Sequence, residues 1–194
     1  QRCDGQLGPQ DHVVMIDRPA GAAVVRALHR LKARGPRVAL MIHDLIPLNV
    51  PRLVPPRSPA AFRGFLEESF GYVDTYLANS DDTACDLRAF LAARGIERAV
   101  IAVPLAQARF DAPAEADDAT GIDAMVRLSP AAHGLAHLPF ALCVGTRETR
   151  KNHWRLIRAW QRLIASGAEG LPRLVLAGGP GWYNEEAEAL LRST

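Results

Sequence analysis

The chain has 194 residues, of which 48% are hydrophobic and 23% are charged, and its formal net charge is +2. These values are typical of a globular protein, and no apolar run approaches the roughly 20 residues of a membrane span. Basic residues are spread along the chain, and six Phe, three Tyr and three Trp offer little for base stacking, which argues against a nucleic-acid binder. Three cysteines without paired spacing, and an amino end unlike a signal peptide, predict a cytoplasmic location.

Strand and helix patterns alternate along the chain. Short apolar runs indicate six parallel strands buried on both faces, at His12–Asp17, Arg37–Ile42, Thr75–Ala78, Ala99–Val103, Phe140–Val144 and Arg173–Ala177. Helical spacing predicts helices over Ala20–Ala33, from Pro59 to about Asp74, and over Asp81–Ala93. Ser58 and Ser80 precede the second and third helices as N-cap residues. This alternation predicts an α/β fold with Rossmann-like open parallel sheets and right-handed crossovers.

The alternation stops between about Gln107 and Leu138, where alanine, proline and acidic residues are frequent. We interpret this segment as a linker between two Rossmann-like domains, with the first over residues 1–111, the linker over 112–138 and the second over 139–194. The second domain has only two predicted strands, and about 55 residues is marginal for an independent core. We therefore expect both domains to be incomplete parts of a longer protein.

The segment FALCVGTRETRKN combines a strand, a basic turn and the start of a helix. The strand opens through Gly145 and Thr146, and the helix is predicted to begin at Asn152, a favoured N-cap residue. The first backbone N–H groups of a helix are unpaired and carry partial positive charge, to which Arg150 and Lys151 add two cations. This combination predicts a site for a diphosphate.

Four segments, taken together, carry a family resemblance. They are MIHDLIPL at Met41–Leu48, LANSDDTACDL at Leu77–Leu87, FALCVGTRETRKN at Phe140–Asn152 and LVLAGGPGW at Leu174–Trp182. With these segments the chain resembles the retaining GT-B glycosyltransferases of group 1 (family 4). It is most similar to the bacterial mannosyltransferase-type enzymes that build lipopolysaccharide and exopolysaccharide chains. The resemblance runs from about His12 to the carboxyl end.

The resemblance implies two facing Rossmann-like domains, with the acceptor on the amino-terminal one and the nucleotide-sugar donor on the carboxyl-terminal one. It implies transfer of a hexose with retention, from GDP-mannose or from a UDP-sugar, onto a glycan or lipid-linked glycan acceptor in polysaccharide synthesis. The nucleotide-sugar is a substrate, and neither a cofactor nor a metal is expected. Peripheral contact with the inner face of the membrane stays open, although helical spacing favours core packing for the apolar group Phe62, Phe65, Leu66 and Phe70.

The resemblance assigns Lys151 to the donor diphosphate. Family members often carry a basic residue directly after the strand glycine, whereas this chain has Thr146 there, so charge neutralisation rests on Lys151, Arg147 or Arg150. The remaining donor-site residues implied by the resemblance are Gly145, Thr146 and Asn152, and the donor loop contains Gly178 and Gly179.

His43 and Asp44 follow a predicted strand, which places both at the edge of a sheet where ligands bind. In related enzymes a histidine near this point contacts the transferred sugar, so we expect His43 to bind the sugar, with Asp44 beside it as the other catalytic candidate. The alternative is that both residues form the polar cap of a buried strand.

Two features common in the family are missing, namely a glycine-rich loop near the amino end and a Glu pair with E-x7-E spacing. Glu185, Glu186 and Glu188 come too early and are wrongly spaced to replace that pair. We therefore expect the chain to be inactive by itself. Two alternatives are a sugar-nucleotide epimerase of the same architecture, for which Asp44 is the clearest cleft carboxylate, and a noncatalytic Rossmann-like binding module.

Overall fold

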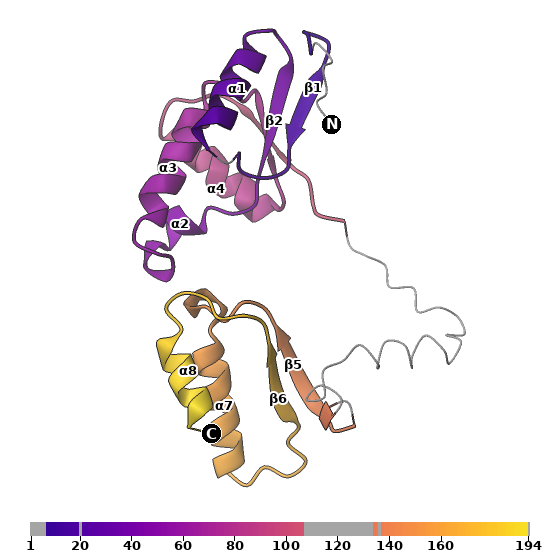
Figure 1. The fold of residues 1–194 in the computed structure, drawn as a ribbon, viewed down its shortest axis with the longest axis vertical. Coiled ribbons are helices and arrows are strands. Elements are labelled where there is room, and N and C mark those ends of the chain that lie inside the picture. The colour runs from indigo at the N-terminus through magenta and orange to yellow at the C-terminus, as the bar shows by residue number, and fades with distance from the viewer. Residues whose placement is uncertain (1–6, 20, 107–133, 136, 194) are drawn as a thin grey trace, which may run out of the picture. The chain divides into compact units, whose positions relative to one another are not determined.

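The computed structural model describes residues 7–19, 21–106, 134–135 and 137–193. The chain divides into two compact units, unit 1 over Gln1–Gln107 and unit 2 over Ala108–Thr194. Each unit is built from parallel strands and helices, which confirms the predicted α/β class (Figure 1). Most of the predicted linker at 112–138 lies outside the described residues.

Unit 1 contains a four-stranded parallel sheet with the order β1-β2-β3-β4. Its strands are β1 (His12–Met15), β2 (Arg37–Ile42), β3 (Thr75–Ala78) and β4 (Ala99–Ala102). All four strands lie where the sequence predicts them, although β1 ends two residues and β4 one residue earlier than expected. The apolar runs thus mark the strands correctly and overestimate the length of the two edge strands.

The helices of unit 1 connect successive strands. They are α1 (Ala22–Lys32), the short α2 (Ile46–Asn49) and η1 (Pro51–Leu53), α3 (Ser58–Ser69) and α4 (Asp81–Ala92). Ser80 caps α4 as predicted, since its hydroxyl accepts a hydrogen bond from the Thr83 N–H at 3.1 Å. Ser58 is the first residue of α3 and forms no cap, and α3 ends at Ser69 rather than near Asp74. The chain must leave the helix early because the residues from Phe70 on lead back into β3.

The helices of unit 1 cover one face of the sheet (Figure 1). The prediction of strands buried on both faces is therefore wrong for the edge strands β1 and β4, whereas Met41 of β2 is buried on the opposite face. The core joins Leu40 of β2 and Tyr76 of β3 to side chains of α1, α3 and α4. On the opposite face Val14 is 57% exposed and Ile101 is 51% exposed. Right-handed crossovers between strands added in one direction place every helix on the same face, which explains the difference.

The apolar group formed by α3 and the following residue Phe70 belongs to the core, as helical spacing favours. Phe65 and Leu66 are buried, and Phe62 and Phe70 pack against the same core cluster. Among the described residues, no helix is both long enough and apolar enough to cross a membrane. These side chains therefore stabilise unit 1, at about 1.5–3 kcal/mol for each fully buried one.

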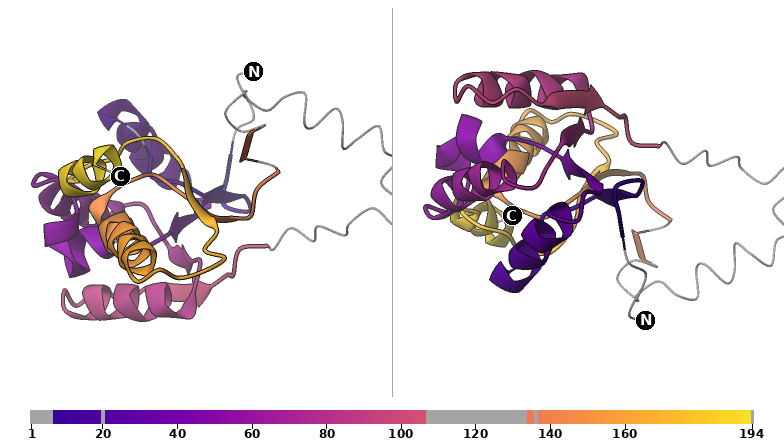
Figure 2. Two further views of the ribbon diagram at one scale, coloured as in Figure 1. Left: turned by 90° about the horizontal axis from the view of Figure 1, so that it is seen from below. Right: turned by 90° about the horizontal axis from the view of Figure 1, so that it is seen from above.

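Unit 2 contains the parallel strands β5 (Phe140–Val144) and β6 (Arg173–Ala177). The helix α7 (His153–Ala165) follows β5, and the helix α8 (Glu185–Arg192) follows β6. Both strands have the predicted limits. The two helices lie side by side and cover one face of the pair (Figures 1 and 2). Leu142 is 54% exposed and Val144 is 74% exposed on the other face, so burial on both faces is wrong here too.

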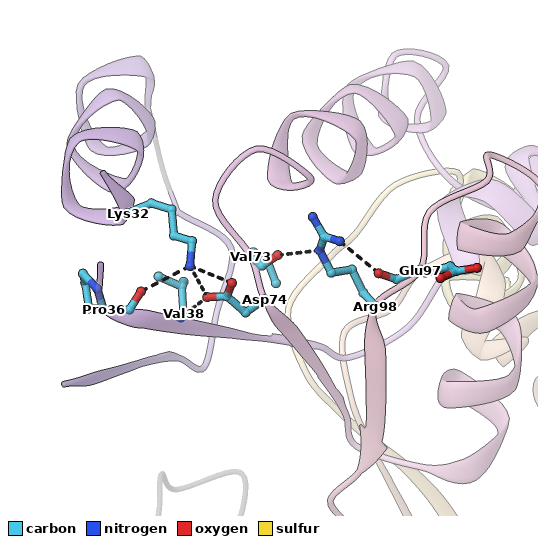
Figure 3. Close-up of polar contacts among 7 residues, drawn as sticks. All are labelled: Lys32, Pro36, Val38, Val73, Asp74, Glu97 and Arg98. Carbon is cyan, nitrogen blue, oxygen red and sulfur yellow. Dashed lines mark hydrogen bonds and ion pairs between the residues drawn. The ribbon is translucent and has the colours of Figure 1, made fainter. Parts of the chain in front are cut away.

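The amino ends of the strands in unit 1 are joined by charged side chains (Figure 3). Lys32, the last residue of α1, donates from Nζ to both carboxylate oxygens of Asp74, at 2.6 and 2.7 Å. Asp74 Oδ2 also accepts from the Val38 N–H at 2.8 Å, and Arg98 Nε donates to the Val73 carbonyl at 3.1 Å. One carboxylate thereby connects α1, β2 and the residue that precedes β3.

Burial by itself would raise the pKa of Asp74, and its hydrogen bonds with Lys32 and Val38 outweigh that effect. Together with the positive charges of Lys32 and Arg98 they hold the pKa below its ordinary value of 3.8. A lowered pKa in the folded state means that the carboxylate stabilises the fold above its ordinary pKa. This contribution is lost as the pH falls through the lowered pKa of the folded state.

We expect Asp74→Asn to destabilise unit 1 at pH 7 by about 1 kcal/mol or less, because the carboxylate is 35% exposed and solvent screens the pair. Hydrogen exchange of the β2 and β3 amides should show faster opening in the variant, and the difference should shrink as the pH falls below the ordinary pKa of Asp74. The control is Glu68→Gln, which removes an exposed carboxylate of α3. Equal exchange in Asp74→Asn and the control would contradict this role.

Candidate functional site

The two loops that follow β5 and β6 lie side by side. They are at the end of the sheet where the carboxyl ends of its strands lie, which we call the carboxyl edge of unit 2. The Gly145 N–H donates to the Ala177 carbonyl at 2.8 Å, and the Arg147 N–H donates to the Gly179 carbonyl at 2.9 Å. The structure therefore brings together the strand-end residues Gly145 and Thr146 and the predicted donor-loop residues Gly178 and Gly179. Ligands of open α/β sheets bind at such an edge.

Glycine is required at position 178 because the two loops contact each other there. Its φ of 156° favours glycine, and an added Cβ would lie 2.0 Å from the Gly145 carbonyl oxygen. A Cβ on Gly179 would meet nothing within 4 Å. The packing of the loops therefore accounts for the glycine at 178, and the open space at Gly179 leaves room beside the donor loop.

Two of the three candidate cations are paired with carboxylates. Arg147 Nε donates to Glu188 Oε1 at 2.7 Å, and its guanidinium also donates to the Gly178 carbonyl. The hydrogen bond from Arg147 lowers the pKa of Glu188. Arg150 Nε lies 2.5 Å from Glu148 Oε1 as an ion pair without the geometry of a hydrogen bond, and Glu148 is 1% exposed.

Lys151 is exposed at the end of the 3-10 turn η2 (Thr149–Lys151), immediately before α7. Within the part of the chain that the structure describes, no ion pair involves its ammonium group. Because Arg147 and Arg150 are held by Glu188 and Glu148, Lys151 is the candidate cation that can neutralise an incoming anion without first breaking an ion pair.

Asn152 occupies the N-cap position of α7 as predicted, although its side chain forms no capping hydrogen bond. The helix begins at His153, and Asn152 has a left-handed backbone with a φ of 58°. The cause is the turn η2, which Asn152 closes by donating its N–H to the Thr149 carbonyl at 3.0 Å. Asparagine is one of the few residues that adopts this conformation readily, which accounts for its presence.

His43 and Asp44 lie at the carboxyl end of β2 in unit 1, and both are exposed. His43 Nε2 lies 2.8 Å from the carbonyl oxygen of Ile16, which only accepts hydrogen bonds, so Nε2 carries a proton. Asp44 Oδ1 accepts from the Ile46 N–H at 3.1 Å and fixes the start of α2. This second interaction belongs to the start of α2, so both the catalytic role of Asp44 and its polar-cap alternative stay predictions. The sugar-binding role of His43 stays a prediction.

The sequence does not predict the burial of two side chains in unit 2. Glu148, which lies in the polar and basic turn, is 1% exposed, and His153, the first residue of α7, is 2% exposed. A Cβ on Gly181 would lie 2.8 Å from Glu148 Cβ, so this glycine packs directly over the glutamate. No local pattern marks the burial of Glu148, because it results from the loop before α8 packing over the turn.

No protein-family model, no curated protein and no solved structure matches this chain. The family named above therefore stays a prediction from the four motifs. The observed parallel α/β units are compatible with Rossmann-like domains.

We expect Gly178→Ala to destabilise unit 2 by at least about 1–3 kcal/mol, because the new methyl group overlaps the Gly145 carbonyl and the φ is unfavourable. Gly179→Ala is the matched control and should change stability little. All three tryptophans, Trp154, Trp160 and Trp182, lie in unit 2. Urea unfolding followed by tryptophan fluorescence therefore reports on this unit. Similar midpoints for the two variants would refute the contact.

Proposed function

We propose that this chain belongs to a retaining GT-B glycosyltransferase that moves a hexose from a nucleotide-sugar, GDP-mannose being the favoured donor, onto a glycan acceptor in cell-surface polysaccharide synthesis. The supporting observation is the exposed Lys151 at the carboxyl edge of unit 2, beside the amino end of α7. The four sequence motifs are the basis for the proposed family, and the carboxyl edge of unit 2 is the proposed location of the donor diphosphate.

Lys151 would act on the leaving group. Breaking the bond between the anomeric carbon and the phosphate oxygen builds negative charge on the departing nucleoside diphosphate. A fixed ammonium group and the amino end of a 13-residue helix both favour that charge, which lowers the barrier to bond cleavage. Because Arg147 and Arg150 are engaged in ion pairs, they compete less with Lys151 for the phosphate, and these ion pairs stabilise the turn that contains Lys151.

His43, at the carboxyl end of β2, is the proposed sugar-binding residue. Its Nε2–H is engaged by the Ile16 carbonyl, so in the neutral ring Nδ1 is an acceptor that can take a hydrogen bond from a sugar hydroxyl. The departing phosphate can accept the proton of the acceptor hydroxyl, so His43 is proposed as a binding group rather than as a general base.

We expect Lys151→Ala to weaken binding of GDP and UDP by about tenfold to a hundredfold, the loss typical of a charge-assisted contact. The control is Arg162→Ala, which removes an exposed cation from the last turn of α7. Both variants should unfold at the same urea concentration as the unchanged chain. Calorimetric titration with each nucleotide measures the effect, and tighter binding of GDP than of UDP would support GDP-mannose.

Unchanged affinity in Lys151→Ala, or an equal loss in Arg162→Ala, would exclude Lys151 as the diphosphate ligand. Absence of any GDP or UDP binding by the unchanged chain would also count against the proposal.

A further inference from the structure

His43 lies at the point where the chain leaves the sheet of unit 1. The last paired positions of β2 and β3 are Ile42 and Ala78, so His43 lies one residue beyond the strand pairing. Its carbonyl instead accepts a hydrogen bond from the Thr83 hydroxyl, with 3.2 Å between the two oxygens. Thr83 belongs to the first turn of α4, the helix that follows β3. A side chain from a later helix thereby holds the backbone of His43 where strand pairing ends.

The Thr83 hydroxyl has a fixed direction. A carbonyl oxygen only accepts hydrogen bonds, so the hydroxyl hydrogen of Thr83 points to His43. Ser80 Oγ lies 3.0 Å from Thr83 Oγ1 and is therefore the donor in that contact. Ser80 Oγ also accepts from the Thr83 N–H at 3.1 Å. The N-cap residue of α4 thus orients the hydroxyl that binds the His43 carbonyl, and hydrogen bonds in such a chain strengthen one another.

Helix formation by itself does not require a threonine at position 83. Threonine is a weaker helix former than alanine, and hydroxyl groups inside a helix often bond to the backbone of their own helix. The Thr83 hydroxyl instead reaches a carbonyl of another element. Thr83 is 7% exposed, so water has little access to replace this hydrogen bond. The hydroxyl therefore serves the segment that follows β2 rather than α4.

The imidazole of His43 is held by a different element. Its Nε2–H donates to the Ile16 carbonyl at 2.8 Å, and Ile16 directly follows β1. The backbone of His43 is thus fixed by α4, and its ring is fixed by the residue after β1. Because a side chain moves with its backbone, a shift of the His43 carbonyl away from Thr83 would displace the ring from Ile16. The contact with Thr83 therefore helps to determine which way Nδ1 faces.

We propose that Thr83 is a positioning residue for His43. Its hydroxyl, oriented by Ser80, holds the His43 backbone so that Nε2–H stays on the Ile16 carbonyl and Nδ1 stays available as an acceptor. The position of the ring is a property of unit 1 alone. Its use in sugar binding rests on the proposed function, so the first test measures the ring without any ligand.

The test compares Thr83→Val, which replaces the hydroxyl with a methyl group of similar size, with Thr83→Ser, which keeps a hydroxyl. NMR of the isotope-labelled full chain measures how fast the His43 Nε2–H exchanges with water. We expect Thr83→Val to raise this rate by about threefold to tenfold, the loss typical of one neutral hydrogen bond. Thr83→Ser should restore most of the slow exchange.

Asn49→Ala is the matched control. Asn49 Nδ2 donates to Asp86 Oδ2 at 2.6 Å, so this variant breaks another hydrogen bond between the segment after β2 and α4. It should leave the exchange of the His43 Nε2–H unchanged. Equal exchange in Thr83→Val and in the unchanged chain, or an equal increase in Asn49→Ala, would overturn the proposal.

Circular dichroism checks that each variant folds, and a second measurement needs no variant. In the unchanged chain the Thr83 hydroxyl proton should exchange slowly and show an NOE to protons of His43. Absence of that NOE, or exchange of the Nε2–H as fast as in a free imidazole, would also refute the positioning role.

The consequence for binding is tested separately by calorimetric titration with GDP and GDP-mannose. Thr83→Val should weaken binding of GDP-mannose by about threefold to tenfold and leave that of GDP unchanged, because His43 is proposed to contact only the sugar. Unchanged affinity for GDP-mannose would exclude use of the ring in sugar binding. If neither nucleotide binds the unchanged chain, the proposed function fails, while the ring measurements still decide the role of Thr83.

Discussion

The parallel pairing of neighbouring strands is the constraint on which each unit depends. Parallel strands need long crossover connections, so the chain returns over the sheet as a helix before each new strand begins. Every strand then ends at the same edge, where loops far apart in the sequence meet. The contact of Gly145 with Ala177 and that of His43 with Ile16 both arise in this way.

Charged side chains have different roles at the amino edge of unit 1, where the amino ends of its strands lie, and at the carboxyl edge of unit 2. At the amino edge of unit 1, Lys32 and Asp74 satisfy each other and join a helix to two strands. At the carboxyl edge of unit 2, Arg147 and Arg150 are held by glutamates that come from α8 and from the turn itself. The sequence has two lysines, of which Lys32 serves the fold and Lys151 is left exposed beside a helix terminus. That contrast supports a binding role for Lys151.

The direction of strand addition decides which apolar side chains are covered. Val14, Ile101 and Leu142 belong to runs that read as fully buried, yet each lies on the face without helices. A continuous apolar run shows that a strand can be buried on both faces. Whether a second layer is present depends on the order in which the strands join the sheet, and here each new strand is added on the same side.

The sequence by itself determined the strands, most helix starts, the cap at Ser80 and the basic turn, because periodicity, capping and glycine placement act over a few neighbouring residues. Tertiary structure alone decided the burial of Glu148, the pairing of Arg147 with Glu188 and the open faces of the sheets. Each of these depends on contacts between segments distant in the chain, such as the loop at Gly181 closing over Glu148. Local patterns carry no record of such contacts, since the same turn residues would be exposed if that loop lay elsewhere.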